Sequence, residues 1–155
     1  MSKEIATVRD VISHLSVLKL DSGETVDNAL RLMEWRQRHA VGVTDNGVFS
    51  GMFTRGDFIH NVVSKDWNPR QTLLGDVMTL DPITVGPECH LLDAFFILCR
   101  NNISHLPVLH NGNFLGIVSD DDLRLNISND LRQLRNDNNH LLSYVGGSYS
   151  LDGVV

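Results

Sequence analysis

The stretch that decides the fold is Asn46-Gly47-Val48-Phe49-Ser50-Gly51-Met52-Phe53-Thr54-Arg55-Gly56-Asp57-Phe58. It recurs 65 residues further on as Asn111-Gly112-Asn113-Phe114-Leu115-Gly116-Ile117-Val118-Ser119-Asp120-Asp121-Asp122-Leu123. The same shift aligns 29–58 with 94–123 without a gap and makes seven positions identical. An ordered pattern of this length that occurs twice indicates an internal repeat.

The repeat extends upstream of this stretch. Asp10-Val11-Ile12-Ser13 matches Asp76-Val77-Met78-Thr79 after a shift that differs by one residue. We therefore divide the chain as follows: a first repeat at 8–63, a linker at 64–73, a second repeat at 74–127, a helix at 128–147 and a frayed tail at 148–155.

Each repeat predicts the order strand, helix, strand, turn, strand, helix. Thr25 is a helix N-cap, and Asn46-Gly47 is a hairpin turn signal. The elements after the first strand are a helix from 26, strands at 40–44 and 48–53, a helix at 58–63, and then a helix at 91–100 and strands at 106–109 and 114–118. A βαββα unit this small cannot bury both its helices and its sheet. We predict an α/β (α+β) fold in which two units pack sheet to sheet about a pseudo-twofold axis.

Composition excludes several classes of protein. The 155 residues carry a formal net charge of −6, which disfavours the basic face that a nucleic-acid or membrane-surface binder needs. The N-terminus shows no signal peptide, and no stretch approaches the ~18 apolar residues of a membrane span. These features predict a cytoplasmic protein.

Two interpretations fit a residue pair that occurs once in each repeat, Thr54 with Asp57 and Ser119 with Asp122. As [Ser/Thr]-x-x-Asp sequences they are capping boxes that satisfy free backbone N–H groups at a helix start. A hydroxyl and a helix N-terminus also suit a phosphate, and a carboxylate one turn further on can accept ribose hydroxyls. The sequence leaves both readings open.

The repeats resemble a tandem pair of CBS domains, the Bateman module, over about 8–127. The motifs that carry the resemblance in the second repeat are Asp76-Val77-Met78-Thr79, Asp81-Pro82-Ile83-Thr84-Val85, Ile103-Ser104-His105-Leu106-Pro107-Val108 and Gly116 to Leu123. The resemblance implies a module with two clefts that bind adenosine compounds (AMP, ADP, ATP, S-adenosylmethionine or NAD-type dinucleotides).

The resemblance also assigns site residues. The ribose-binding carboxylates are Asp57 and Asp122, and the hydroxyls near ribose or phosphate are Thr54 and Ser119. Residues implied to line the clefts near the base or at the strand starts are Thr79, Pro82, Ile83, Ser13, Val17, Leu18, Ser104, His105, Pro107, His39, Ala40 and Gly42.

Three departures from the family pattern predict unequal clefts. Arg55 and His39 favour a more highly charged nucleotide in their cleft. Asp120 and Asp121 repel a phosphate in the other, unless they face solvent, hold a cation or serve as first-turn acids of a helix. Gly42 replaces the family's usual proline and predicts a looser strand start.

Catalysis and resident metals have little support in the sequence. The seven histidines form no zinc-type spacing, and no nucleophile motif or P-loop is present. We predict no enzyme activity, no catalytic residue, no metal site and no required cofactor, with Mg²⁺ as a possible companion of the nucleotide.

The segment after the second repeat shows heptad spacing. Ile127, Leu131, Leu134, Asn138, Leu141 and Val145 are spaced four and three residues apart alternately. Asn at an a position fixes register in parallel two-stranded coiled coils. This spacing fits two alternatives: a helix that pairs with another chain, and a helix that folds back on the module.

The sequence therefore predicts a stand-alone, homodimeric sensor that binds an adenine nucleotide and signals to an effector protein in trans. The alternative is a structural or interaction module whose clefts are vestigial and empty.

Overall fold

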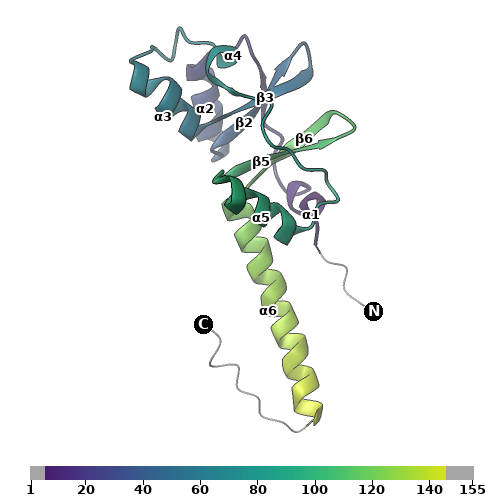
Figure 1. Cartoon of the computed structure of the whole chain (residues 1–155). Helices are drawn as coiled ribbons and strands as arrows, with labels where there is room; N and C mark the ends of the chain where they lie inside the picture. The colour runs from purple at the N-terminus through teal and green to yellow at the C-terminus, as the bar shows by residue number, and fades with distance from the viewer. Residues whose placement is uncertain (1–5, 146–155) are drawn as a thin grey trace.

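The computed structural model describes residues 6–145. The elements in chain order are α1 (Val8–Ile12), β1 (Lys19–Asp21), α2 (Val26–Arg36), β2 (Ala40–Asp45), β3 (Val48–Thr54), α3 (Arg55–Asn61), the 3₁₀ helix η1 (Val63–Lys65), α4 (Leu74–Val77), β4 (Thr79–Leu80), α5 (Leu91–Asn101), β5 (His105–His110), β6 (Asn113–Ser119) and α6 (Asp120–Val145). The fold is a mixed α/β arrangement of two repeats with a long C-terminal helix (Figure 1).

Each repeat is built around a β-hairpin. Strands β2 and β3 pair antiparallel in the first repeat, and β5 and β6 pair in the same way in the second. Both turns are Asn-Gly with positive φ: 49° and 80° at Asn46 and Gly47, and 51° and 78° at Asn111 and Gly112. This is the conformation that a two-residue hairpin needs and that asparagine and glycine tolerate best, which confirms the predicted turns.

The first sheet includes a strand of the second repeat. Its order is β1-β2-β3-β4, where β1 lies parallel to β2 and β4 pairs antiparallel with β3. In the second repeat the counterpart of β1 is reduced to one parallel bridge, Val85 to Val108. The segment that leads into the second repeat therefore completes the sheet of the first.

The two repeats also exchange their first helices. Val8 and Val11 of α1 are buried in the core of the second repeat, together with Leu91 and Leu98. Leu74 and Val77 of α4 are buried in the core of the first repeat. Neither hydrophobic core is complete without a helix from the other half of the sequence, so the repeats form one interlocked body.

Gly42 is not a loose point of the chain. Its N–H donates to the carbonyl of Leu18 at 2.9 Å, and it pairs with strands on both sides. A side chain added at Gly42 would lie 2.5 Å from the ring of Phe114, which stacks on Phe49 with a 5.2 Å centroid separation. Glycine at this position lets β6 pack against β2, so the predicted looseness is wrong.

Helix α6 runs without a break from the first turn of the second repeat's last helix to Val145. Figure 1 shows it leaving the two repeats as a rod, so the alternative in which it folds back on the module is wrong. Ile127 packs on the second core, whereas Leu131 is 61% exposed. The tail at 148–155 and the end of the predicted helix at 146–147 lie outside the described residues.

Candidate functional site

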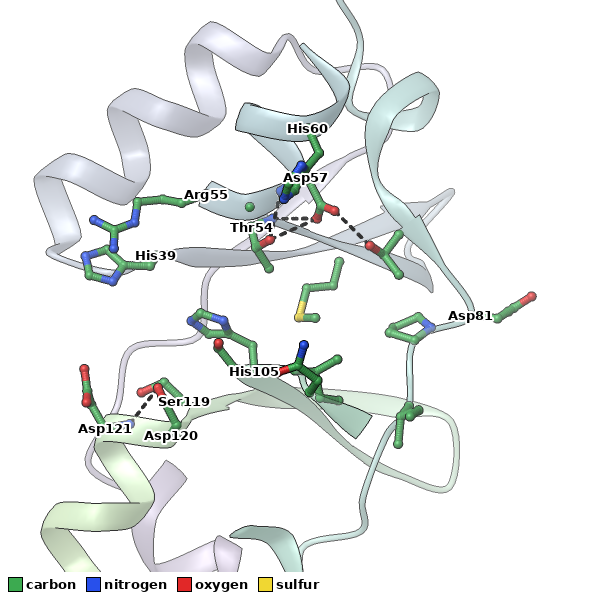
Figure 2. A pocket seen from close by; sticks show the side chains of 18 residues that line it. His39, Thr54, Arg55, Asp57, His60, Asp81, His105, Ser119, Asp120 and Asp121 are labelled. Carbon is green, nitrogen blue, oxygen red and sulfur yellow. Dashed lines mark hydrogen bonds between the residues drawn. The ribbon is translucent and has the colours of Figure 1, made fainter. Parts of the chain in front are cut away.

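A cavity of about 870 Å³ lies between the two repeats, a volume typical of small-molecule sites (Figure 2). The residues that line it are His39, Met52, Thr54, Arg55, Gly56, Asp57, His60, Thr79, Asp81, Pro82, Ile83, Asn102, Ile103, Ser104, His105, Ser119, Asp120 and Asp121. They come from both repeats, because the starts of α3 and α6 and the segment around β4 all reach this cavity.

Most residues that the resemblance assigned to a cleft meet here. The assigned residues that line the cavity are His39, Thr54, Arg55, Asp57, Thr79, Pro82, Ile83, Ser104, His105 and Ser119. Seven assigned residues are not among the lining residues: Ser13, Val17, Leu18, Ala40, Gly42, Pro107 and Asp122. Leu18, Ala40 and Pro107 are buried, while Val17 is 51% exposed.

Six lining residues had not been assigned to the site: Met52, Gly56, His60, Asp81, Asn102 and Ile103. His60 lies one helical turn after Asp57 on α3, so that spacing could have placed it on the same face. Asp81 follows β4 in a left-handed conformation with φ 45°, which turns the chain into the cavity wall.

Asp57 is positioned by a capping box at the start of α3. Its carboxylate accepts from the Thr54 backbone N–H at 2.9 Å, and its own N–H donates to the Thr54 hydroxyl at 3.2 Å. The other carboxylate oxygen accepts from the hydroxyl of Thr79, in β4, at 3.0 Å. Burial raises the pKa of Asp57 above its ordinary value, and these hydrogen bonds offset only part of that effect. The capping reading is therefore confirmed at Thr54, and the same carboxylate also lines the cavity.

Asp122 makes the same capping box at the start of α6 but has an additional charged partner. It accepts from the Ser119 N–H at 2.8 Å and from both terminal nitrogens of Arg38, at 3.1 and 2.8 Å. Burial acts to raise the pKa of Asp122, but the Arg38 guanidinium and the Ser119 hydrogen bonds outweigh it and hold the pKa below its ordinary value. Equivalent carboxylates in the two repeats thus have opposite pKa shifts.

The charges around the cavity are mixed. Arg55 and His39 lie together on the side of the first repeat, and Asp120 and Asp121 lie on the side of the second (Figure 2). The prediction that these acidic residues lie in a different cleft from Arg55 is wrong. The cause is the packing of the repeats, which brings the starts of α3 and α6 to one cavity.

His105, at the start of β5, is largely buried in the cavity wall. Burial lowers the pKa of His105 from 6.5 to about 4; Asp120 acts to raise it, whereas Arg38 and His39 act to lower it further. His105 is therefore neutral at pH 7. Between pH 6.5 and 4 the unfolded chain binds a proton at this position that the folded chain does not, so stability falls as the pH is lowered.

We expect His105 to cost the fold about 2 kcal/mol when the pH is lowered from 7 to 5. Replacing it with glutamine, which cannot take up a proton, should remove this part of the pH dependence of the free energy of unfolding. Urea unfolding at several pH values measures the effect. His14→Gln, at an exposed histidine, is the matched control and should keep the full dependence. An unchanged pH slope in His105→Gln would contradict the assignment.

Within residues 6–145, no group of three His, Cys, Asp or Glu side chains is placed to hold a metal ion. In the same part of the chain, no helix combines the length and the apolar character that crossing a membrane requires.

Two interlocked, pseudo-symmetric repeats around a polar cavity define a tandem module built for a small ligand. The family model described as "CBS domain" matches residues 5–64 and 74–129. The chain belongs to the CBS-domain family. CBS-domain proteins are in general regulatory, ligand-binding modules.

Curated relatives are themselves CBS-domain proteins. YhcV of Bacillus subtilis is 28% identical over 122 residues, which are 79% of this chain and 86% of that protein. CBSCBSPB2 of Arabidopsis thaliana is 32% identical over 102 residues, which are 65% of this chain and 19% of that protein. The chain therefore spans about a fifth of the length of this Arabidopsis relative.

Solved structures share the fold. The CBS-domain protein ATU1752 of Agrobacterium tumefaciens has a TM-score of 0.69 at 24% identity and covers 76% of this chain and 96% of its own. The hexameric CBS-CP12 protein of bloom-forming cyanobacteria has a TM-score of 0.70 at 20% identity and covers 97% of this chain and 89% of its own.

Proposed function

We propose that this protein is a regulatory sensor that binds an adenine nucleotide or related adenosyl ligand in the cavity between its repeats. The observation that carries the proposal is the carboxylate of Asp57, held at the cavity wall by Thr54 and Thr79. A carboxylate fixed in this way is suited to accept hydrogen bonds from the two hydroxyls of a ribose. The role comes from the family resemblance, and the geometry supports it.

The surroundings of Asp57 suit the other parts of a nucleotide. Pro82, Ile83 and Met52 give the cavity an apolar portion against which a base can pack. Arg55 and His39 supply the donors that a phosphate requires. Base, ribose and phosphate thus each have complementary residues in one cavity.

The acidic residues of the cavity restrict the charge of the ligand. Asp81, Asp120 and Asp121 line the same space as Arg55 and repel a free polyphosphate. We therefore expect a ligand with one phosphate, such as AMP, to bind better than metal-free ATP. Mg²⁺, which neutralises phosphate charge, should restore part of the ATP affinity.

Isothermal titration tests this proposal. AMP, ADP, ATP with and without Mg²⁺, S-adenosylmethionine and NADH are each titrated into the purified chain. We expect heat of binding for at least one of them, and weaker binding of ATP when Mg²⁺ is left out. Absence of binding by every compound at millimolar concentration would favour the alternative, an interaction module with empty clefts.

Helix α6 supports a second part of the proposal, self-association and signalling in trans. Leu125 and Leu131 are 65% and 61% exposed on a helix that projects from the module. Leu131 also belongs to the heptad series of the sequence, and exposed apolar residues in such a series are typical of a helix that pairs with a second helix. The cyanobacterial CBS-CP12 protein, which has the same fold, is described as hexameric, and this supports the proposed self-association.

Truncation tests this role of α6. A chain that ends at Asp130 loses most of the heptad segment, and light scattering should give the mass of a smaller assembly than that of the whole chain, a monomer if α6 is the main contact. A chain that ends at Val145 keeps the segment and is the matched control, with the assembly unchanged. Equal assembly states in both truncations would show that self-association does not depend on α6.

A further inference from the structure

Asp57 and Asp122 occupy the same position in the two repeats but have different partners. Beyond its capping box, Asp57 accepts only from the hydroxyl of Thr79 among residues 6–145, and a carboxylate can accept further hydrogen bonds from a ligand. Asp122 instead faces the guanidinium of Arg38, which donates to both of its carboxylate oxygens. Asp122 therefore has a charged, two-pronged partner where Asp57 has a single neutral hydroxyl.

The difference originates in a single residue before the middle strand of each repeat. Arg38 precedes β2, and the residue at the same position before β5 is Ile103. Isoleucine cannot pair with Asp57, whereas Arg38 reaches across to the other repeat. Its guanidinium also donates to the carbonyl of Ile117 at 3.2 Å, so it is held at three points.

The pair is sheltered from solvent. The side chain of Arg38 is 21% exposed and that of Asp122 is 15% exposed. Two parallel N–H···O bonds between an arginine and a carboxylate are among the strongest hydrogen bonds in proteins, and shelter from water strengthens them further. A ribose hydroxyl is neutral and cannot easily displace this partner.

The pseudo-symmetry of the two repeats predicts a second cleft at Asp122, with counterparts of the residues that form the Asp57 site. Ser119 caps α6 as Thr54 caps α3. Val17, the counterpart of the cavity residue Ile83, is 51% exposed and remains available to a base, as Ile83 is at 43%. The predicted second cleft differs from the cavity at Asp57 in one respect: the Arg38 side chain lies beside its carboxylate.

We propose that Arg38 is a built-in occupant of this second cleft, so that the chain binds one nucleotide, at Asp57, and not two. Its guanidinium takes the hydrogen-bonding positions that a ribose would need on Asp122. This inference rests on the proposed function for the location of the one open site. Removing the guanidinium opens a second ribose site on Asp122.

The exchange of Arg38 and Ile103 tests the inference with radiolabelled AMP in equilibrium dialysis. The natural chain should bind one AMP per chain at saturation. Arg38→Ile, which gives the first repeat the residue of the second, should bind two. Ile103→Arg, which gives the second repeat the arginine of the first and adds a guanidinium to the cavity wall, should bind none. Arg31→Ile, at an exposed arginine that pairs with Asp27, is the control and should still bind one.

Circular dichroism and thermal melting establish whether each variant is folded. If Arg38→Ile does not fold, Arg38→Met, which keeps the aliphatic part of the side chain, replaces it in the experiment. The inference would be overturned if the natural chain bound two AMP, or if the folded Arg38→Ile variant bound no more AMP than the natural chain. If the natural chain bound no AMP and Arg38→Ile bound one, the open site at Asp57 would be rejected while the role of Arg38 would be supported. The failures of the two proposals are therefore distinguishable.

Discussion

Replacing Gly51 with alanine should lower the free energy of unfolding by about 3 kcal/mol and abolish ligand binding. Gly51 lies in β3 opposite Leu80 of β4. A Cβ atom there would lie 2.6 Å from the backbone carbonyl oxygen of Thr79 and 2.8 Å from the sulfur of Met78. Because the nearest atom belongs to the backbone, the clash is relieved only if β4 moves away from β3.

The loss of binding follows from the same displacement. Thr79 holds Asp57 through its hydroxyl, and Pro82 and Ile83 follow β4 directly into the cavity wall. Urea unfolding and AMP titration measure the two effects. Gly86→Ala is the matched control, because its Cβ would meet only the Leu109 carbonyl at 3.9 Å, an ordinary contact. A Gly51→Ala protein as stable as the control would contradict the close approach of β4.

Asp57→Asn should weaken AMP binding by about 10- to 100-fold, the equivalent of one charged hydrogen bond of 1.5–3 kcal/mol. The change keeps the size of the side chain but removes the charge and turns one acceptor into a donor. It should also cost about 1 kcal/mol of stability through the capping box with Thr54. Isothermal titration and urea unfolding separate these two effects.

Asp27→Asn is the control for Asp57→Asn. Asp27 is also an acidic residue in the first turn of a helix, α2, but it pairs with Arg31 on the surface and does not line the cavity. We expect a small loss of stability and no change in AMP affinity. If Asp57→Asn bound AMP as tightly as Asp27→Asn does, the ribose role taken from the family resemblance would be incorrect.

The local elements were predictable because their signals lie within a few residues of one another. Asn46-Gly47 and Asn111-Gly112 specify hairpin turns through the positive φ angles that these residues accept. Thr25 caps α2 through its hydroxyl, which accepts from the N–H of Asn28. A repeat of such signals in the same order also predicts that two similar units share one core.

The cavity was predictable only in part. Thr54, Asp57 and Thr79 belong to motifs that the family resemblance identifies, and the structure brings them together. Asp81 lies in a quoted motif but was given no site role, and Asn102 lies in none; each reaches the cavity through a backbone turn with positive φ. Residues of this kind are found only when the path of the chain is known.

The amino-acid sequence by itself determined that the protein consists of two related units with hairpins, capped helices and a heptad segment, because these depend on neighbouring residues. Only the tertiary structure decided which core each short helix completes. The apolar residues of α1 suit either core, and only packing places α1 in the second and α4 in the first. The same packing brings Arg38 to Asp122, 84 residues away, and so makes the carboxylates at equivalent positions of the two repeats chemically unequal.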